Sequence, residues 1–191
     1  DETKLLRWSL ELCDVMQYLH TRKPQPIIFR NLSPKNVILS KDGKLKLIDF
    51  GLSKLFDPEA RTLAVAKTAK MYFSPMEQYT TKTDERTDIY SLGATLYFLI
   101  TKVPPIDAID RTLNSVPLYS CRKFNPQANL DFEKILFKAM ELNPDNRYSD
   151  IPAMRAELEK IKTVEPEKEP EISEVEFHES EEEDTISEEE L

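Results

Sequence analysis

Residues 27–51 read IIFRNLSPKNVILSKDGKLKLIDFG, and the segments before and after this stretch are expected to support it. Two short apolar runs flank Asp42-Gly43, and an Asp-Gly pair between apolar runs is a strong signal for a β-hairpin. Such a hairpin would bring Asn36, just before its first strand, close to Asp49, just after its second. An amide oxygen and a carboxylate that converge in this way suit Mg²⁺, which prefers oxygen ligands.

The same stretch resembles the catalytic loop and metal-binding loop of protein kinases, in which H-R-D-L-x-x-x-N is followed by D-F-G. Residues 29–31 read Phe-Arg-Asn where the family has H-R-D, Asn36 stands at the metal-binding Asn, and residues 49–51 are an intact D-F-G. The alternative is a surface hairpin with a chance D-F-G. The ordered spacing and the motifs further along the chain argue against that alternative.

This resemblance implies a role for several side chains. Asn36 and Asp49 would bind Mg²⁺, and Ile38 would form the floor of the adenine pocket for ATP. Arg30 is expected to face the activation segment, where such an Arg can pair with a phosphorylated side chain. Thr68 is the best candidate phosphosite in that segment, and a plain solvated hydroxyl is the alternative.

Two residues of the loop depart from the family pattern. Asn31 stands where the family has the Asp that accepts or orients the proton of the substrate hydroxyl, and a neutral amide lacks that basicity. Ser33 stands where the family usually has Lys or Arg, whose charge stabilises the transferring phosphoryl group. Both changes predict weak or absent phosphoryl transfer. They favour a pseudokinase that scaffolds partners over a slow Ser/Thr protein kinase.

Motifs after residue 72 also match the family. Residues 73–79 resemble the A-P-E motif, and the resemblance implies an ion pair between Glu77 and Arg147, whose breaking would cost about 3 to 5 kcal/mol. Residues 84–100 resemble the start of the central buried helix. There Asp88 is expected to hydrogen-bond the catalytic-loop backbone, and Thr87 or Asp88 is expected to cap the helix.

The fold class follows from these matches and from the apolar periodicity. We expect a mainly helical fold with one small β-hairpin, equivalent to the C-terminal lobe of a protein kinase domain. His20, at the end of the first helix, is expected to be structural. Helices are expected over residues 2–20, over a segment that includes 92–100, over 130–142 and from 149 to about 161.

Length and charge divide the 191 residues into two parts. Residues 1–162 are expected to form the lobe, with 21 acidic and 25 basic residues. Residues 163–191 contain 14 acidic residues and one Lys, and are expected to be an acidic disordered tail. The chain has only 3 Gly, too few for a G-x-G-x-x-G phosphate loop beside Gly43, Gly51 and Gly93, so the nucleotide-cradling lobe of a kinase is not expected within these 191 residues. A truncated fragment is therefore a third interpretation.

The resemblance also implies cofactors and partners. A full-length protein would use ATP and Mg²⁺ and would act on a protein substrate or scaffold a protein partner, and no nucleic-acid partner is expected. No apolar run is long enough for a transmembrane segment. Cys13 and Cys121 are isolated in the sequence, which favours free thiols in a reducing compartment and a cytoplasmic location.

Overall fold

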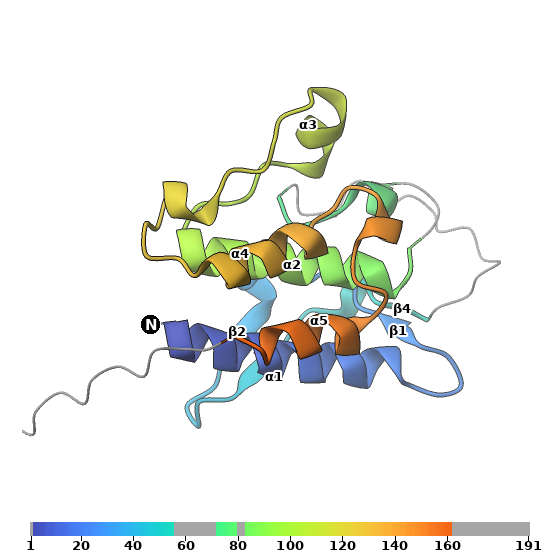
Figure 1. Ribbon diagram of the computed structural model, residues 1–191. Helices are drawn as coiled ribbons and strands as arrows, with labels where there is room; N and C mark the ends of the chain where they lie inside the picture. Colours follow the sequence, from blue (N-terminus) through green and yellow to red (C-terminus); the bar gives the residue numbers. More distant parts are fainter. Residues whose placement is uncertain (1, 56–71, 80–82, 162–191) are drawn as a thin grey trace, which may run out of the picture.

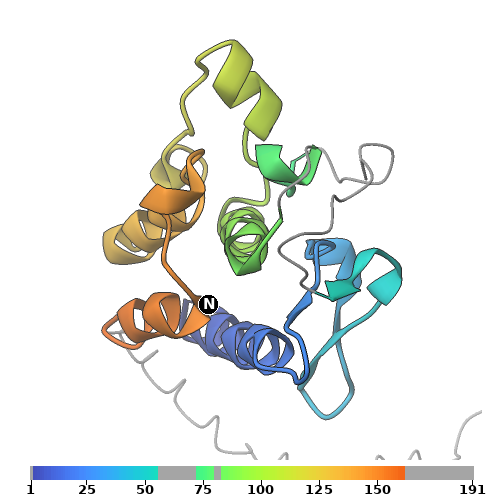
Figure 2. The same ribbon diagram turned by 90° about the vertical axis from the view of Figure 1, so that its right-hand side faces the viewer.

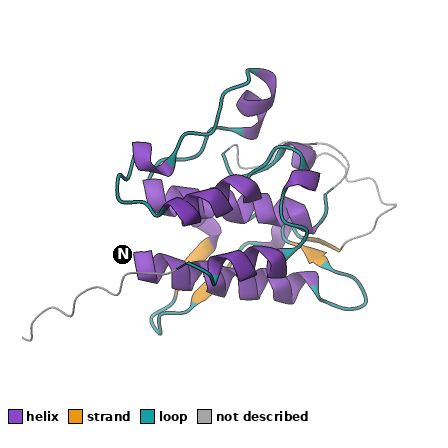
Figure 3. Cartoon of the chain, viewed as in Figure 1, coloured by secondary structure: helices purple, strands orange, loops and turns teal. Residues whose placement is uncertain are grey.

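The computed structural model describes residues 2–55, 72–79 and 83–161. Within them, the expected mainly helical class is confirmed, with two small antiparallel sheets beside the helices (Figures 1 and 3). The helices are α1 (Glu2–His20), α2 (Glu85–Thr101), α3 (Ala108–Leu113), α4 (Leu130–Ala139) and α5 (Ile151–Leu158). The strands are β1 (Ile27–Ile28), β2 (Val37–Leu39), β3 (Leu45–Leu47) and β4 (Lys54–Leu55).

The predicted hairpin is formed by β2 and β3. Val37 pairs with Leu47 and Leu39 with Leu45 in antiparallel register. Gly43 takes a φ of 78° at the turn, a backbone conformation that residues with a side chain rarely adopt. The second sheet pairs β1 with β4, each only two residues long, and was not predicted because such short strands leave no periodic pattern.

Helix α2 is the centre of the core. Ile89, Leu92 and Leu96 on this helix have no exposed surface, as expected for a helix that is apolar on nearly all sides. In Figure 2 it is seen end-on, with α1 and α5 packed together on one side of it and the hairpin on another. Helices α1 and α4 contact α2 directly, so the three helices share one buried core.

The N-terminus of α2 differs from the prediction. Asp84, not Thr87 or Asp88, caps the helix, and its side chain accepts a hydrogen bond from the Arg86 N–H at 2.8 Å. Thr87 and Asp88 lie inside the first turn and are fully buried. Asp84 is also a residue of capping type, and the Asp88 carboxylate accepts hydrogen bonds from other parts of the chain, as described below.

Two other helices are shorter than predicted. Helix α4 ends at Ala139 rather than Leu142, and beyond its end the carbonyl oxygens of Glu141 and Leu142 accept hydrogen bonds from Arg147. Helix α5 covers residues 151–158, with Asp150 as its cap: the carboxylate accepts from the Ala153 N–H at 2.8 Å. None of the helices in the described ranges is both long and apolar enough to cross a bilayer.

Candidate functional site

The loop after β1 is held in place by one buried carboxylate. The backbone N–H groups of Phe29 and Arg30 each donate to Asp88 at 2.7 Å, the contacts expected for this Asp. His20 Nε2 lies 2.9 Å from Asp88 Oδ2, so this His has a structural role, as predicted. Because Asp88 belongs to α2, the loop is anchored to the most buried helix of the fold.

Asn31, Asn36 and Asp49 meet at the base of the hairpin. Asn31 Nδ2 donates to the backbone carbonyl oxygen of Asp49 at 2.7 Å, and Asn36 Nδ2 donates to the backbone carbonyl oxygen of Asn31 at 2.7 Å. The Ile48 N–H donates to the Asn36 carbonyl oxygen at 3.0 Å, which extends the hairpin down to the residue before Asp49. The structure therefore brings together the two residues that were predicted to approach each other, with Asn31 between them.

The donor set at Asn36 and Asp49 fits Mg²⁺. Asn36 is buried, and because its Nδ2 faces Asn31, its amide oxygen is the atom left to face a cation. Asp49 is exposed and has left-handed backbone angles, φ 63° and ψ 68°. A carboxylate and an amide oxygen are ligands that Mg²⁺ takes together with phosphate oxygens and water. No group of three or more His, Cys, Asp or Glu side chains that could hold a metal ion occurs in the described part of the chain.

Ser33 and Ile38 lie close to this group in the sequence. Ser33 precedes the short 3-10 helix Pro34–Asn36 and is buried, so it presents no charge where the family has a cation. Ile38 is 46% exposed on β2, and its Cα is paired with that of Lys46. An exposed apolar side chain on this strand is available as one face of an adenine pocket.

Arg30 is buried beneath the site. Its φ is 59°, and its carbonyl oxygen accepts from Gln78 Nε2 at 2.7 Å. Burial lowers the pKa of the Arg30 guanidinium, while the nearby Asp88 carboxylate acts in the opposite direction. The activation segment that Arg30 was expected to face is largely residues 56–71, which lie outside the described ranges, as does the candidate phosphosite Thr68.

The predicted ion pair between Arg147 and Glu77 is present. Arg147 Nη1 lies 2.5 Å from Glu77 Oε1, and the Arg147 side chain has no exposed surface. The same guanidinium donates to the carbonyl oxygens of Arg86, Glu141 and Leu142. This pair joins the turn Met76–Tyr79 to α2 and to the segment after α4.

Two contacts at the site were not predicted. The Phe29 and Phe50 rings meet edge to face with centroids 4.9 Å apart, so the Phe in place of the family's His packs on the D-F-G Phe. The bond from Gln78 to the Arg30 carbonyl links the loop to the turn that contains Glu77. Neither has a sequence signal, because each depends on residues that are far apart in the chain.

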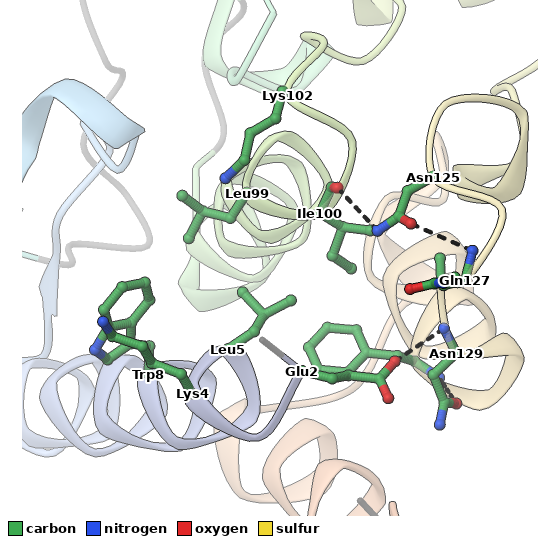
Figure 4. Close-up of a pocket in the computed structure, with 12 residues that line it drawn as sticks. Glu2, Lys4, Leu5, Trp8, Leu99, Ile100, Lys102, Asn125, Gln127 and Asn129 are labelled. Carbon is green, nitrogen blue, oxygen red and sulfur yellow. Dashed lines mark hydrogen bonds between the residues drawn. The ribbon is translucent and has the colours of Figure 1, made fainter. Parts of the chain in front are cut away.

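A separate cavity of about 530 Å³ lies between α1, α2 and the start of α4 (Figure 4). Leu5, Leu99 and Ile100 form part of its apolar wall, and the Asn129 N–H donates to Glu2 Oε1 at 3.0 Å on its polar side. None of the predicted site residues lines this cavity. The candidate site is therefore the group at the base of the hairpin.

Comparison with known proteins shows the family of the chain. The family model for the protein kinase domain matches residues 1–160. A probable serine/threonine-protein kinase from Clostridium perfringens is 36% identical over 144 residues, which are 71% of this chain and 21% of the relative. Serine/threonine-protein kinase PknB from Mycobacterium tuberculosis is 31% identical over 172 residues, covering 84% of this chain and 27% of PknB. PknB from Mycobacterium leprae is 28% identical over 170 residues, 84% of this chain and 27% of the relative.

The fold is a mainly helical lobe in which Asn31, Asn36 and Asp49 meet at the base of a β-hairpin. The family match covers most of the chain, and the chain belongs to the protein kinase family. It spans about a quarter or less of the length of these curated relatives. The protein kinase family uses ATP and Mg²⁺.

Proposed function

We propose that residues 1–162 are the C-terminal lobe of a Ser/Thr protein kinase-like protein that retains Mg²⁺ ligands and is impaired in phosphoryl transfer. The observation that carries this proposal is the direction of the Asn31 side chain. Its NH₂ group donates to the Asp49 carbonyl oxygen at 2.7 Å, within a residue that is only 5% exposed. A group placed in this way does not offer a basic atom to a substrate hydroxyl.

The remaining residues support binding better than chemistry. Asp49 and the amide oxygen of Asn36 would hold Mg²⁺, and Ile38 would contact the adenine of ATP. Bound Mg²⁺ would neutralise charge on the phosphate oxygens of ATP. Transfer to a protein hydroxyl also requires that the hydroxyl proton be accepted and that charge be stabilised, and neither Asn31 nor the buried Ser33 supplies these functions.

Asn31 and Ser33 favour a role in binding a protein partner, as a scaffold, over a role in catalysis. The ion pair of Arg147 and the anchoring of the loop by Asp88 maintain the lobe independently of catalysis. A folded lobe in which Asn31 replaces the base and Ser33 replaces the cationic residue is what a pseudokinase requires. Two free buried cysteines support a cytoplasmic location, because such thiols are typical of reducing compartments.

Phosphorylation of a generic Ser/Thr substrate tests the proposal. The protein expressed from its longest open reading frame is compared, at saturating Mg²⁺ and ATP, with its Asn31→Asp, Ser33→Lys double variant. We expect transfer by the natural protein to lie near background and the double variant to be faster by at least about tenfold, since a general base alone contributes about 10² to 10⁴.

An Asp49→Asn change in the double variant serves as the control, because it removes the metal-binding carboxylate and should return the rate to background. Comparable rates for the natural protein and the double variant, both well above this control, would show that the interpretation of Asn31 is wrong.

A further inference from the structure

The side chain of Asn31 does something that an Asp at this position could not do. An amide has a donor end and an acceptor end, whereas an ionised carboxylate has acceptors only. The atom of Asn31 at 2.7 Å from the Asp49 carbonyl oxygen is Nδ2. The opposite orientation would place two oxygen atoms in contact, so the chemistry of the partner fixes which way the amide points.

Asn31 also receives a bond from the other predicted metal ligand. The Asn36 side chain donates to the backbone carbonyl oxygen of Asn31 at 2.7 Å, and the Ile48 N–H donates to the backbone carbonyl oxygen of Asn36 at 3.0 Å. These three bonds run from Asp49 through Asn31 to Asn36 and return to the residue before Asp49. The two predicted ligands are thus connected through Asn31, by its side-chain NH₂ group on one side and its backbone carbonyl oxygen on the other.

The loop around Asp49 is restrained on its C-terminal side by Ser53, whose hydroxyl donates to the Phe29 carbonyl oxygen at 3.4 Å and which precedes strand β4. Asp49 has a positive φ of 63°, which is uncommon for a residue with a side chain. Phe50 is 48% exposed, so its packing on Phe29 covers only part of the ring. The next turn is closed by the Ser53 N–H, which donates to the Phe50 carbonyl oxygen at 2.9 Å.

We infer that Asn31 is a positioning residue for the metal site: its amide holds the Asp49 carbonyl and thereby fixes the Asp49 carboxylate relative to Asn36. An asparagine at this position is then the gain of a donor as well as the absence of a base. This inference rests on the proposed Mg²⁺ site, but the bond exists without metal and can be measured without it.

Two substitutions in the full 191-residue chain separate donor from charge. Asn31→Asp keeps the shape and removes the donor, and Asn31→Ala removes the donor without adding charge. Asn129→Asp is the matched control, because Asn129 uses its side-chain oxygen only to accept from the N–H groups of Asp131 and Phe132 at 2.8 and 3.2 Å. The same chemical change there keeps the cap intact.

The first readout is metal-free hydrogen exchange of the Ser53 amide, followed by NMR. We expect exchange about tenfold faster in both Asn31 variants and unchanged in the Asn129 variant, since a lost hydrogen bond is worth about a factor of ten. If the Asn31→Ala variant exchanges like the natural chain, the inference is wrong. Faster exchange in Asn31→Asp alone would also overturn it, because charge would then be the cause.

The second readout is affinity for Mn²⁺, followed by paramagnetic broadening of the loop resonances. We expect affinity about tenfold weaker in both Asn31 variants, the effect typical of losing a residue that orients a metal ligand. Phe132→Leu, a core change in α4, reports the effect of lost stability alone and should leave affinity unchanged. If Mn²⁺ does not bind the natural chain, the proposed Mg²⁺ site is wrong, while the exchange rates still decide whether Asn31 holds the loop.

Discussion

Asp88 shows how a single buried carboxylate can organise a loop. A buried charge is costly unless it is hydrogen-bonded, and Asp88 receives the N–H groups of Phe29 and Arg30 and contacts His20. Its place in the first turn of α2 adds a favourable interaction with the positive end of the helix dipole. One residue therefore links α1, α2 and the loop that contains Asn31.

The pair of Arg147 and Glu77 permits a prediction on stability. Glu77→Gln keeps the shape of the side chain but leaves the guanidinium of Arg147, which has no exposed surface, without its counter-charge. We expect the free energy of unfolding to fall by about 3 kcal/mol or more, as found for broken buried ion pairs. Urea denaturation followed by circular dichroism measures this change.

Lys134→Ala is the control for this experiment. Lys134 pairs with Asp131 at 2.7 Å on the surface of α4, and both side chains are more than two-thirds exposed. Solvent screens such a pair, so its loss should hardly change the unfolding midpoint. A Glu77→Gln variant as stable as this control would mean that Arg147 is sufficiently stabilised by the carbonyl oxygens around it.

At the scale of elements, the contact between α2 and α4 depends on a glycine. A Cβ placed on Gly93 would lie 2.9 Å from Ala139 Cβ and 2.9 Å from Met140 Cγ. The Ala139 atom is fixed by its own backbone, so the two helices would have to separate. Helix α2 therefore accepts a residue of low helix propensity in order to approach α4 closely.

Gly93→Ala should destabilise the chain for this reason. Alanine favours a helix interior over glycine by about 1 kcal/mol, but overpacking costs about 1 to 3 kcal/mol and the contact here is with a rigid neighbour. We expect a net loss of about 1 kcal/mol or more in urea denaturation. A stability equal to or above that of the natural chain would show that the helices can move apart at little cost.

A double-mutant cycle with Ala139→Gly tests the cause. By itself Ala139→Gly should cost about 1 kcal/mol through helix propensity. In the Gly93→Ala background it removes one of the two close contacts, so its cost should become smaller or change sign. Strictly additive effects would place the source of the destabilisation elsewhere.

The elements differ in how far the sequence could predict them. The hairpin and α1 were predicted because Asp42-Gly43 and the apolar spacing in residues 2–20 are local signals. The first residue of α2 was not predicted correctly. Asp84 caps the helix because the Asp88 carboxylate accepts from the backbone of the loop after β1, a contact that only the folded chain shows. The end of α4 at Ala139 was not predicted either, because apolar residues continue to Leu142 and the spacing alone does not mark where the helix stops.

The candidate site divides in the same way. The meeting of Asn36 and Asp49 follows from hairpin geometry, and the resemblance supplied the partner of Arg147. The bond from Asn31 to the Asp49 carbonyl could not be predicted from the sequence. A motif comparison shows at this position only the absence of an acid, whereas the folded chain shows which atoms the amide contacts.

Four apolar side chains near the candidate site are exposed. Ile38, Leu39, Ile48 and Phe50 are each 40 to 48% exposed on or beside the hairpin. Clustered exposed apolar side chains mark surfaces that bind other groups or proteins. Helices α1, α2, α4 and α5 share one continuous core behind this surface.

The two cysteines can report on that core as a unit. Cys13 on α1 and Cys121, in the turn Cys121–Lys123, are both fully buried, and burial raises the pKa of each thiol to about 12. Since only the thiolate reacts with iodoacetamide, both should be inert in the folded chain at pH 8. We expect labelling at least about 10³-fold slower than in urea, limited by unfolding.

The two sites should be labelled at the same rate if the helical core opens as one cooperative unit, because both thiols belong to the same cluster of buried residues. Mass spectrometry of the labelled peptides measures each rate, and much faster labelling of Cys121 would mean that its segment opens separately.

The raised pKa values of the two thiols also set the pH dependence of the stability of the chain. The thiol contribution to stability is complete below the ordinary pKa of 9.0 and is lost as the pH rises toward 12, so opening should become more frequent in alkali.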